Sequence, residues 1–279
     1  MVYQGQIGLG MDDLDQLVRA ILQSPKYKSV YEGVVRGIGS RELAVGRSWK
    51  EALKATKSKL HQVGAAYFDR HIKYTHWLDE LRTAAESGDR DAFLRTCSDV
   101  MRHHSSTRER LGMLGVFYTR TLAHLPRVNT VLDIACGLNP LAIPWMPLDK
   151  DVQYYAYDMY RDMLDFLNEF MRIAQVRGQA QACDVTQFPT TPKAELAFIL
   201  KSLPCVEQLD KSASLRLLEA VNADHLLISF PVRSLGGRDK RMAQNYEAHF
   251  WELVQDKPWS VRRFEFATEL AFLVTKSVL

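Results

Sequence analysis

The segment from Val131 to Pro140 constrains the fold of this chain most strongly. It reads VLDIACGLNP, an apolar stretch that leads into a turn of small residues, and Asp133 stands at the entrance to that turn. Asp158 ends a second apolar stretch 25 residues later, and Asp184 ends a third segment after a further 26 residues. Ligands of parallel α/β sheets bind outside the carboxyl ends of the strands. Three acidic residues at successive strand ends therefore predict a site for a nucleoside-like cofactor, whereas turn formation explains each acid singly but not the ordered series.

The composition is that of an ordinary globular protein. The chain has 279 residues, of which 47% are hydrophobic and 25% are charged, enough for one large domain and a smaller one. No apolar run approaches the roughly 18 residues of a membrane-spanning helix, and the first residues do not resemble a signal peptide, so we expect a cytoplasmic protein. The cysteines lack C-x-x-C spacing, and we expect neither a metal site nor a disulfide framework. They are Cys97, Cys136, Cys183 and Cys205.

Positive charge is concentrated near the N-terminus. Residues 16–78 contain twelve lysines and arginines but four acidic residues, a net charge of +8, while the rest of the chain carries −5. A basic module joined to a mildly acidic one suggests a polyanionic partner for the basic part. A solvated helical face explains the same charges equally well, so charge alone leaves both interpretations open.

Apolar residues in the first hundred positions recur with the helical period. Asp12 is expected to cap a helix with apolar residues on one face, and Ser48 is expected to cap another whose lysines lie largely outward. Pro25 and the segment Gly37–Gly39 predict breaks. Further helices are predicted over residues 74–87, 91–102 and 107–124. We therefore expect an all-α domain over residues 1–104.

From residue 130 the pattern changes to strands and helices in alternation. Apolar runs predict strands at residues 130–134, 152–157, 179–183, 196–200 and 225–230, with helices around 163–177 and 212–221. The runs at 261–266 and 270–276 predict an antiparallel hairpin. Five alternating strands and a hairpin are typical of a doubly wound, seven-stranded sheet with one reversed strand, so residues 105–279 are expected to form a Rossmann-like α/β domain.

The first turn decides which cofactor this sheet is expected to hold. A dinucleotide-binding turn needs the pattern G-x-G-x-x-G, but the corresponding positions here are Ala135, Gly137 and Pro140. Because phosphates would be crowded at this turn, a cofactor without phosphates is favoured, and S-adenosylmethionine is one. Asp158 is then expected to accept the ribose hydroxyls and Asp184 the adenine amino group.

Four linked motifs resemble those of the aminoglycoside-resistance 16S ribosomal RNA methyltransferases. They are Ser105–Arg110 (SSTRER), Asp133–Pro140 (DIACGLNP), Leu200–Pro204 (LKSLP) and Ser229–Arg238 (SFPVRSLGGR). The resemblance implies a class I S-adenosylmethionine-dependent methyltransferase that modifies guanine N7 in the decoding site of the assembled 30S subunit. It also implies resistance to kanamycin- and gentamicin-type drugs and an RNA-docking role for the basic N-terminal domain. A monomer is expected, but the sequence fixes neither the oligomeric state nor the host of the gene.

The resemblance also assigns the cofactor site. Arg110 is implied to hold the methionine carboxylate, with Glu109 as an orienting neighbour, and an ordinary surface ion pair is the alternative for Arg110. Met159 and Val185 are implied to pack on the adenine faces, and the small residues of the first turn would let the backbone approach the cofactor. The full set implied to bind the cofactor is Arg110, Asp133, Ala135, Gly137, Asp158, Met159, Asp184 and Val185.

Lys201 and Arg238 are implied to act at the target nucleotide. Lys201 ends an apolar run, where a buried strand rarely places a charge, although a lysine that reaches from a strand end to solvent is the alternative. Arg238 follows a flexible pair of glycines. A flipped guanine could stack on Tyr160 or Phe230, and the sequence does not choose between them, although core packing is favoured for Phe230.

Other basic residues are expected to contact RNA phosphates, with a solvated surface as the alternative. They are Lys50, Lys54, Lys57, Lys59, Arg108, Arg233 and Lys240. His103 and His104 invite a general-base interpretation, but helix-end capping is favoured for both.

The implied chemistry needs little acid or base catalysis. Guanine N7 carries an unprotonated lone pair, so the enzyme has to position the two reactants and exclude water. We therefore expect no catalytic triad and no metal. Three alternatives stay open: an S-adenosylmethionine enzyme for another target such as adenine N1 or a small molecule, a non-catalytic RNA-binding or assembly factor, and a nicotinamide-dependent oxidoreductase. The missing glycines disfavour the oxidoreductase.

Overall fold

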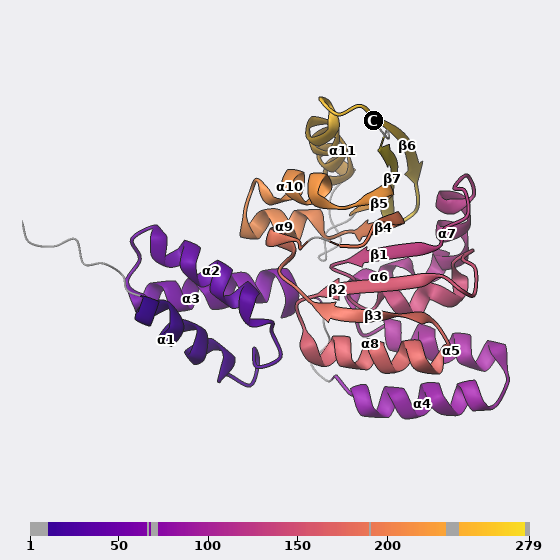
Figure 1. Cartoon of the computed structure of the whole chain (residues 1–279), viewed down its shortest axis with the longest axis horizontal. Coiled ribbons are helices and arrows are strands. Elements are labelled where there is room, and N and C mark those ends of the chain that lie inside the picture. The colour runs from indigo at the N-terminus through magenta and orange to yellow at the C-terminus, as the bar shows by residue number, and fades with distance from the viewer. Residues whose placement is uncertain (1–10, 66, 68–71, 190, 233–239, 277–279) are drawn as a thin grey trace, which may run out of the picture.

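The computed structural model describes residues 11–65, 67, 72–189, 191–232 and 240–276. It contains a seven-stranded sheet with helices on both faces and a group of N-terminal helices that extends to one side of the sheet (Figure 1). The strands are β1 (Thr130–Ile134), β2 (Gln153–Asp158), β3 (Arg177–Ala182), β4 (Ala194–Leu200), β5 (Ala223–Pro231), β6 (Trp259–Glu265) and β7 (Glu269–Lys276).

The strand order is β3-β2-β1-β4-β5-β7-β6, and β7 runs antiparallel to both β5 and β6. The predicted seven-stranded sheet with one reversed strand is therefore confirmed. Because the chain moves from β1 outward to β3 and then returns to place β4 on the other side of β1, the order reverses between β1 and β4. Open α/β sheets bind ligands at such a reversal.

Helices cover both faces of the sheet, which explains why its central strands are continuous apolar runs rather than alternating ones. One face packs against α7 (Leu114–Leu122) and α8 (Arg161–Ile173), whose Phe166 and Phe170 are buried there. The other face packs against α9 (Leu203–Leu209), α10 (Ala213–Ala220) and α11 (Lys240–Val254). Neither α9 nor α11 was predicted from the sequence pattern.

The N-terminal helices form a small core of their own, to which Leu209 of α9 also contributes. They are α1 (Met11–Leu22), α2 (Glu32–Ala44), α3 (Trp49–Leu60) and the π-helix η1 (His61–Ala65). Ser48 caps α3 as predicted, and Glu51 completes a capping box by accepting a hydrogen bond from the Ser48 N–H group. Asp12 lies inside the first turn of α1 and does not cap it.

The predicted break at Gly37–Gly39 is wrong, because α2 continues through both glycines. A Cβ atom on Gly39 would lie 2.8 Å from Leu17 Cδ2. Glycine at this position therefore lets α1 and α2 approach closely, which is a packing role that resembles a helix break in the sequence.

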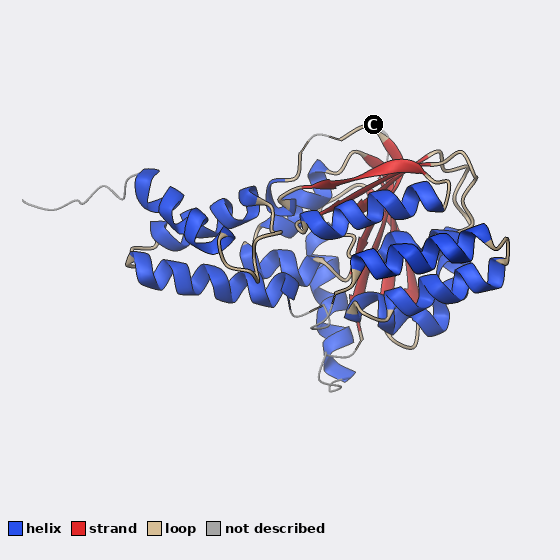
Figure 2. Ribbon diagram, turned by 90° about the horizontal axis from the view of Figure 1, so that it is seen from below, coloured by secondary structure: helices blue, strands red, loops and turns tan. Residues whose placement is uncertain are grey.

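Two further helices belong to the core of the sheet. Trp77 and Leu81 of α4 (Tyr74–Glu86) and Cys97 of α5 (Arg90–Met101) share the core of α8. Figure 2 shows the N-terminal helices projecting from this larger part. The division between the two cores thus falls before α4, whereas the sequence analysis placed both helices in a domain that ends at residue 104.

The helix expected over residues 107–124 is interrupted. It consists of α6 (Ser105–Arg110), the 3₁₀ turn η2 (Leu111–Met113) and α7. Gly112 lies in the interruption and lowers its helix propensity. No helix in the described ranges is long and apolar enough to cross a membrane.

Candidate active site

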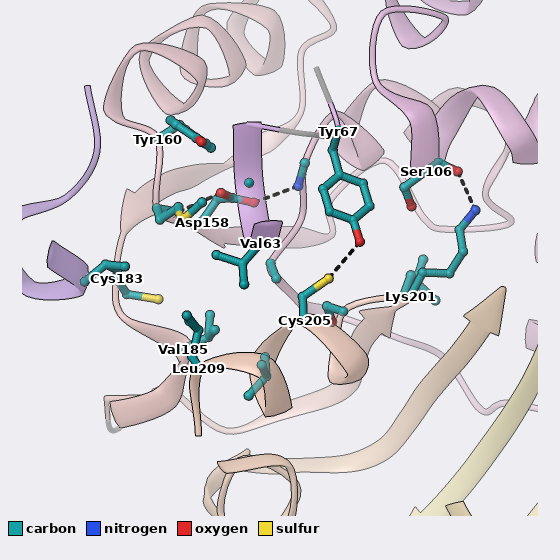
Figure 3. Close-up of a pocket in the computed structure, with 18 of the residues that line it drawn as sticks. Val63, Tyr67, Ser106, Asp158, Tyr160, Cys183, Val185, Lys201, Cys205 and Leu209 are labelled. Atoms are coloured by element: carbon teal, nitrogen blue, oxygen red, sulfur yellow. Dashed lines mark hydrogen bonds between the residues drawn. The ribbon is translucent and has the colours of Figure 1, made fainter. Parts of the chain in front are cut away.

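A pocket lies at the carboxyl ends of β1, β2 and β4 and beside the segment that follows β3, where the strand order reverses (Figure 3). It encloses about 740 Å³ of space, including open solvent at its mouth. The lining residues at or just after the ends of these strands are Ala135, Gly137, Asp158, Met159, Tyr160, Cys183, Asp184, Val185, Leu200, Lys201 and Ser202. The pocket therefore brings together most of the residues predicted to bind the cofactor.

The turn after β1 forms one wall. Ala135 and Gly137 adopt positive φ angles of 53° and 51°, a conformation that is strained for alanine. A Cβ atom on Gly137 would lie 2.7 Å from His104 Cε1, so only glycine leaves space for that ring. The small residues of this turn thus let the backbone reach the pocket.

Asp158 ends β2 and holds this turn in place. Its Oδ2 atom accepts a hydrogen bond from the Gly137 N–H group over 2.9 Å, and Oδ1 accepts one from the Met159 N–H group over 2.6 Å. Burial raises the pKa of Asp158, and the backbone N–H groups that it accepts from act against that shift. Figure 3 shows Asp158 among the lining residues.

Asp184 follows β3 and caps the short 3₁₀ turn η4 (Val185–Gln187). Its Oδ1 atom accepts hydrogen bonds from the N–H and hydroxyl groups of Thr186. Its Oδ2 atom faces α2, where a Cβ atom on Gly37 would lie 2.9 Å away. The acid is thus fixed in orientation at the end of the pocket nearest the N-terminal helices.

Lys201 lies at the end of β4 and lines the pocket, and its backbone has a positive φ of 57°. Its Nζ atom donates to the Ser106 carbonyl over 2.7 Å and to Glu109 Oε2 over 2.9 Å. Glu269 Oε2 lies 3.7 Å from the same nitrogen. Burial lowers the pKa of Lys201, whereas the two carboxylates act against that shift. The side chain is therefore bound inside the protein and does not extend into solvent.

Arg110 lies outside the lining of the pocket. Its side chain is 1% exposed, and Nε and Nη2 donate to Glu269 over 3.0 and 2.6 Å, while Nη1 donates to Asn139 Oδ1. Glu109, the expected neighbour, pairs with Lys201 instead. Although burial alone would raise it, Arg110 and Lys201 hold the pKa of Glu269 below its usual value.

Sequence reasoning missed Glu269, because an acid at the start of a terminal strand gives no signal of its long-range partners. Glu269 thus pairs with Arg110 and also lies next to the ammonium group of Lys201.

Asp133 also lies outside the lining of the pocket, beneath the first turn. Its Oδ2 atom accepts hydrogen bonds from Asn139 Nδ2 over 3.0 Å and from the Tyr154 hydroxyl over 2.6 Å. Burial raises the pKa of Asp133 to about 7, and both hydrogen bonds act against the rise. The structure thus places this acid as a support for the turn, although the sequence analysis grouped it with the cofactor ligands.

The N-terminal helices supply the opposite wall, which the sequence analysis did not predict. Val34, Val63, Gly64 and Tyr67 line the pocket. Backbone hydrogen bonds fasten these helices to its rim, from the Tyr31 N–H group to the Met159 carbonyl over 2.7 Å and from the Arg161 N–H group to the Ser29 carbonyl over 2.8 Å. The pocket is thus built from both cores of the molecule.

Comparison with known proteins identifies the family. Residues 23–273 match the family described as Ribosomal RNA methyltransferase (FmrO). The chain belongs to this family. The 16S rRNA (guanine(1405)-N(7))-methyltransferase of Micromonospora rosea is 34% identical over 269 residues, which cover 96% of this chain and 98% of the relative. The protein of the same name from Serratia marcescens is 30% identical and covers 95% and 99%, respectively.

Solved structures give the same result for this FmrO-family chain. The 16S rRNA methyltransferase RmtF in complex with S-adenosyl-L-homocysteine matches with a TM-score of 0.79 and 28% identity, covering 96% of this chain and all of RmtF. The 16S rRNA methylase RmtB matches with a TM-score of 0.76 and 26% identity, covering 95% and 98%. The similarity therefore includes the N-terminal helices as well as the sheet.

The basic residues expected to contact RNA differ in their surroundings. Lys50 and Lys54 of this FmrO-family chain are exposed on α3, and Lys57 is half-buried. Lys59 instead forms a 2.8 Å ion pair with the buried Glu42. Arg108 is exposed and donates to the Arg102 carbonyl. Arg233 and Arg238 lie outside the described residues, and the side chain of Lys240 is not described.

The aromatic side chains lie partly in the pocket and partly in the core. Tyr160 lines the pocket, whereas Phe230 is fully buried in the core between the sheet and α11. Tyr67 is a further lining aromatic, and its hydroxyl lies 2.9 Å from Cys205 Sγ. Burial lowers the pKa of His104 to about 3, so this ring is neutral near pH 7.

Proposed function

We propose that this FmrO-family methyltransferase transfers a methyl group from S-adenosylmethionine to N7 of guanine 1405 in 16S ribosomal RNA within the 30S subunit. The observation that carries the proposal is the near full-length similarity to proteins named for that activity. The pocket at the place where the strand order of the sheet reverses agrees with it. Methylation of the decoding site would confer resistance to kanamycin- and gentamicin-type aminoglycosides.

The residues present fit S-adenosylmethionine. Asp158 and Asp184 offer carboxylates at two positions, and an apolar lining residue directly follows each of them, Met159 and Val185. When bound, the cofactor supplies an electrophilic methyl group on a sulfonium centre.

We assign roles to these residues from their positions. Asp158 accepts the ribose hydroxyls, Asp184 accepts the adenine amino group, and Met159 and Val185 pack on the adenine ring. Ala135 and Gly137 bring the backbone of the first turn against the methionine end. Asp133 acts beneath that turn by holding its shape.

Arg110 is assigned to the methionine end as a source of positive charge behind the pocket wall. Its donors are engaged by Glu269 and Asn139, so a direct bond to the methionine carboxylate requires the exchange of one of these partners. The bidentate geometry of a guanidinium suits either carboxylate.

Lys201 is assigned to the target guanine, together with Arg238 from the segment outside the described residues. Methylation of N7 places a positive charge on the guanine ring, so an unbalanced ammonium group nearby would oppose the reaction. Glu109 and Glu269 balance the charge of Lys201. The lysine can therefore position the base through a hydrogen bond without repelling the product.

No residue has to remove a proton, because guanine N7 is unprotonated. The neutral His104 is consistent with this chemistry, and alignment and exclusion of water supply the rate enhancement. Tyr160 and Tyr67 are the lining aromatics that can stack on a flipped base.

RNA docking is assigned to the N-terminal helices and to the exposed basic residues near the pocket. Lys50, Lys54 and Lys57 give α3 a basic face, and Arg108 extends positive charge along α6. Contact with phosphates by such residues is independent of base sequence and sensitive to salt.

The test is to incubate the protein with S-adenosylmethionine carrying a labelled methyl group and with either 30S subunits or free 16S RNA. We expect label in the 30S subunits, at guanine N7 when the digested RNA is mapped by mass spectrometry. Label at adenine N1 would identify a different ribosomal RNA methyltransferase. No transfer together with no cofactor binding in calorimetry would indicate a non-catalytic RNA-binding protein.

A further inference from the structure

A short backbone bridge joins the N-terminal helices to the strand end that carries Asp158. Val30, which lies between α1 and α2, pairs with Tyr160 in an isolated antiparallel β-bridge. Beside this pair, the Tyr31 N–H group donates a 2.7 Å hydrogen bond to the Met159 carbonyl. The bridge therefore ends on two residues that line the cofactor pocket.

The next residues along the chain extend this contact. The Arg161 N–H group donates to the Ser29 carbonyl over 2.8 Å, and the Ser29 hydroxyl donates to Asp162 Oδ2 over 2.8 Å. The Arg161 guanidinium also lies over the Tyr31 ring, 5.6 Å from its centre. Arg161 and Asp162 begin α8, which packs on the sheet. The contacts of residues 29–31 with residues 159–162, here called the Val30–Tyr160 bridge, thus connect the N-terminal helices to the larger core.

The same helices reach the pocket through apolar side chains. Val34 of α2 and Val63 of η1 line it together with Asp158 and Val185 of the larger core, and Figure 3 shows Val63 and Asp158 at this pocket. A cofactor that fills the pocket therefore contacts both cores at once. These contacts exist only while the helices lie against the sheet, so a bound cofactor has to stabilise that arrangement.

We propose that S-adenosylmethionine has a second role as a structural ligand, which holds the N-terminal helices against the sheet together with the Val30–Tyr160 bridge. The 30S subunit has to contact these helices while its target base enters the pocket, so it binds the same arrangement. Cofactor and 30S subunit then bind with positive coupling, and each strengthens the binding of the other by the same factor. This inference rests on the proposed function and adds to it a coupling between the two substrates.

The strength of the bridge sets the size of this coupling. If the bridge alone held every molecule in the competent arrangement, the cofactor could not increase 30S affinity any further. A weaker bridge leaves more molecules with displaced helices, and the cofactor returns these molecules to the competent arrangement. The cofactor should therefore improve 30S binding most in a variant whose bridge is broken.

Tyr31→Pro removes one hydrogen bond of the bridge, because proline has no N–H group to donate to the Met159 carbonyl. Tyr31 has a φ of −59°, close to the ~−65° that proline requires, so the backbone can keep its course. Tyr31→Ala is the matched control, since it loses the same ring but keeps the N–H group. Asp162→Ala, which loses the acceptor of the Ser29 hydroxyl, and Asp165→Ala, at an exposed acid of the same helix, form a second pair.

For each protein, affinity for 30S subunits is measured at one salt concentration, without cofactor and with saturating S-adenosylhomocysteine, which has no methyl group to transfer. The readout is the ratio of these two affinities. Calorimetry gives the affinity for S-adenosylhomocysteine alone, and thermal unfolding verifies that each variant is folded.

We expect the ratio to be about five-fold larger in Tyr31→Pro than in Tyr31→Ala, the effect of losing about one hydrogen bond. Without cofactor, Tyr31→Pro should bind 30S subunits more weakly than Tyr31→Ala, and saturating S-adenosylhomocysteine should remove most of this difference. The ratio should also rise in Asp162→Ala, to a smaller extent, whereas Asp165→Ala should match the parent.

Equal ratios in Tyr31→Pro and Tyr31→Ala would overturn the coupling, and methylation of 30S subunits by the parent would still leave the proposed function intact. If Tyr31→Pro does not fold, the comparison of Asp162→Ala with Asp165→Ala decides in the same way. Failure of the parent to bind 30S subunits at all would instead refute the proposed function.

Discussion

Substitution of Gly64 by alanine tests whether the N-terminal helices form a wall of the cofactor pocket. A Cβ atom on Gly64 would lie 1.9 Å from Met159 Cε and 2.5 Å from the Tyr160 hydroxyl oxygen. Carbon atoms in contact lie about 3.5–4.0 Å apart, so Met159 has to move by about 2 Å or the helices have to tilt away. Either movement disturbs the surface on which the adenine ring is expected to pack.

Met159 Cε ends a flexible side chain that can turn away at little cost, so overpacking here falls at the low end of the usual range, at about 1 kcal/mol. If the cofactor-bound state carries this cost, the dissociation constant for S-adenosylmethionine rises about five-fold. Calorimetric titration measures the affinity, and thermal unfolding verifies that the variant is folded.

Gly115→Ala is the matched control, because no atom lies within 4 Å of the added Cβ. Gly115 is in α7, where alanine should stabilise the helix by about 0.5–1 kcal/mol and leave cofactor affinity unchanged. A folded Gly64→Ala protein that binds the cofactor as tightly as the parent would refute the reasoning.

Four further variants probe the charged groups. Glu269→Gln leaves buried cations uncompensated and should lower the free energy of unfolding by about 3–5 kcal/mol in calorimetry, and a loss below about 1 kcal/mol would contradict the buried pair. Asp133 has a pKa raised to about 7 when folded, so between about pH 4 and 7 the folded protein binds a proton that the unfolded chain lacks, and stability from this group falls as pH rises. The melting temperature of Asp133→Asn minus that of the parent should therefore increase from pH 5 to 8. A difference that stays constant over this range would contradict the raised pKa of Asp133. Asp158→Ala should lose cofactor binding. The double variant Lys50→Ala with Lys54→Ala should retain cofactor binding and bind 30S subunits more weakly in a salt series. Loss of cofactor binding in the double variant, but not in Asp158→Ala, would contradict both assignments.

Periodicity in the sequence was sufficient to predict the sheet. The strands β1 and β4 are mostly apolar and almost continuously buried because both of their faces are covered, and two adjacent apolar runs indicate the reversed hairpin. The helix break predicted at Gly37–Gly39 failed for a physical reason. The sequence cannot distinguish a glycine that ends a helix from one that admits a neighbouring helix, since both lack a Cβ atom.

Site residues that lie at or just after the end of a strand could also be predicted. Asp158 and Asp184 follow directly from the strand pattern, and Lys201 was noticed because a charge after an apolar run is unusual. Glu269 and Gly64 could not be predicted, because their roles depend on contacts between segments far apart in the chain. Arg110 was singled out by its motif, yet its partner Glu269 lies 159 residues away.

The most direct measurement of the central claim uses 30S subunits in which guanine 1405 of the 16S RNA is replaced by adenine. The parent protein and labelled S-adenosylmethionine are added to these subunits and to unsubstituted ones. The account predicts about one methyl group per unsubstituted subunit, located on guanine N7, and none on the substituted subunits. Equal labelling of both preparations would contradict it.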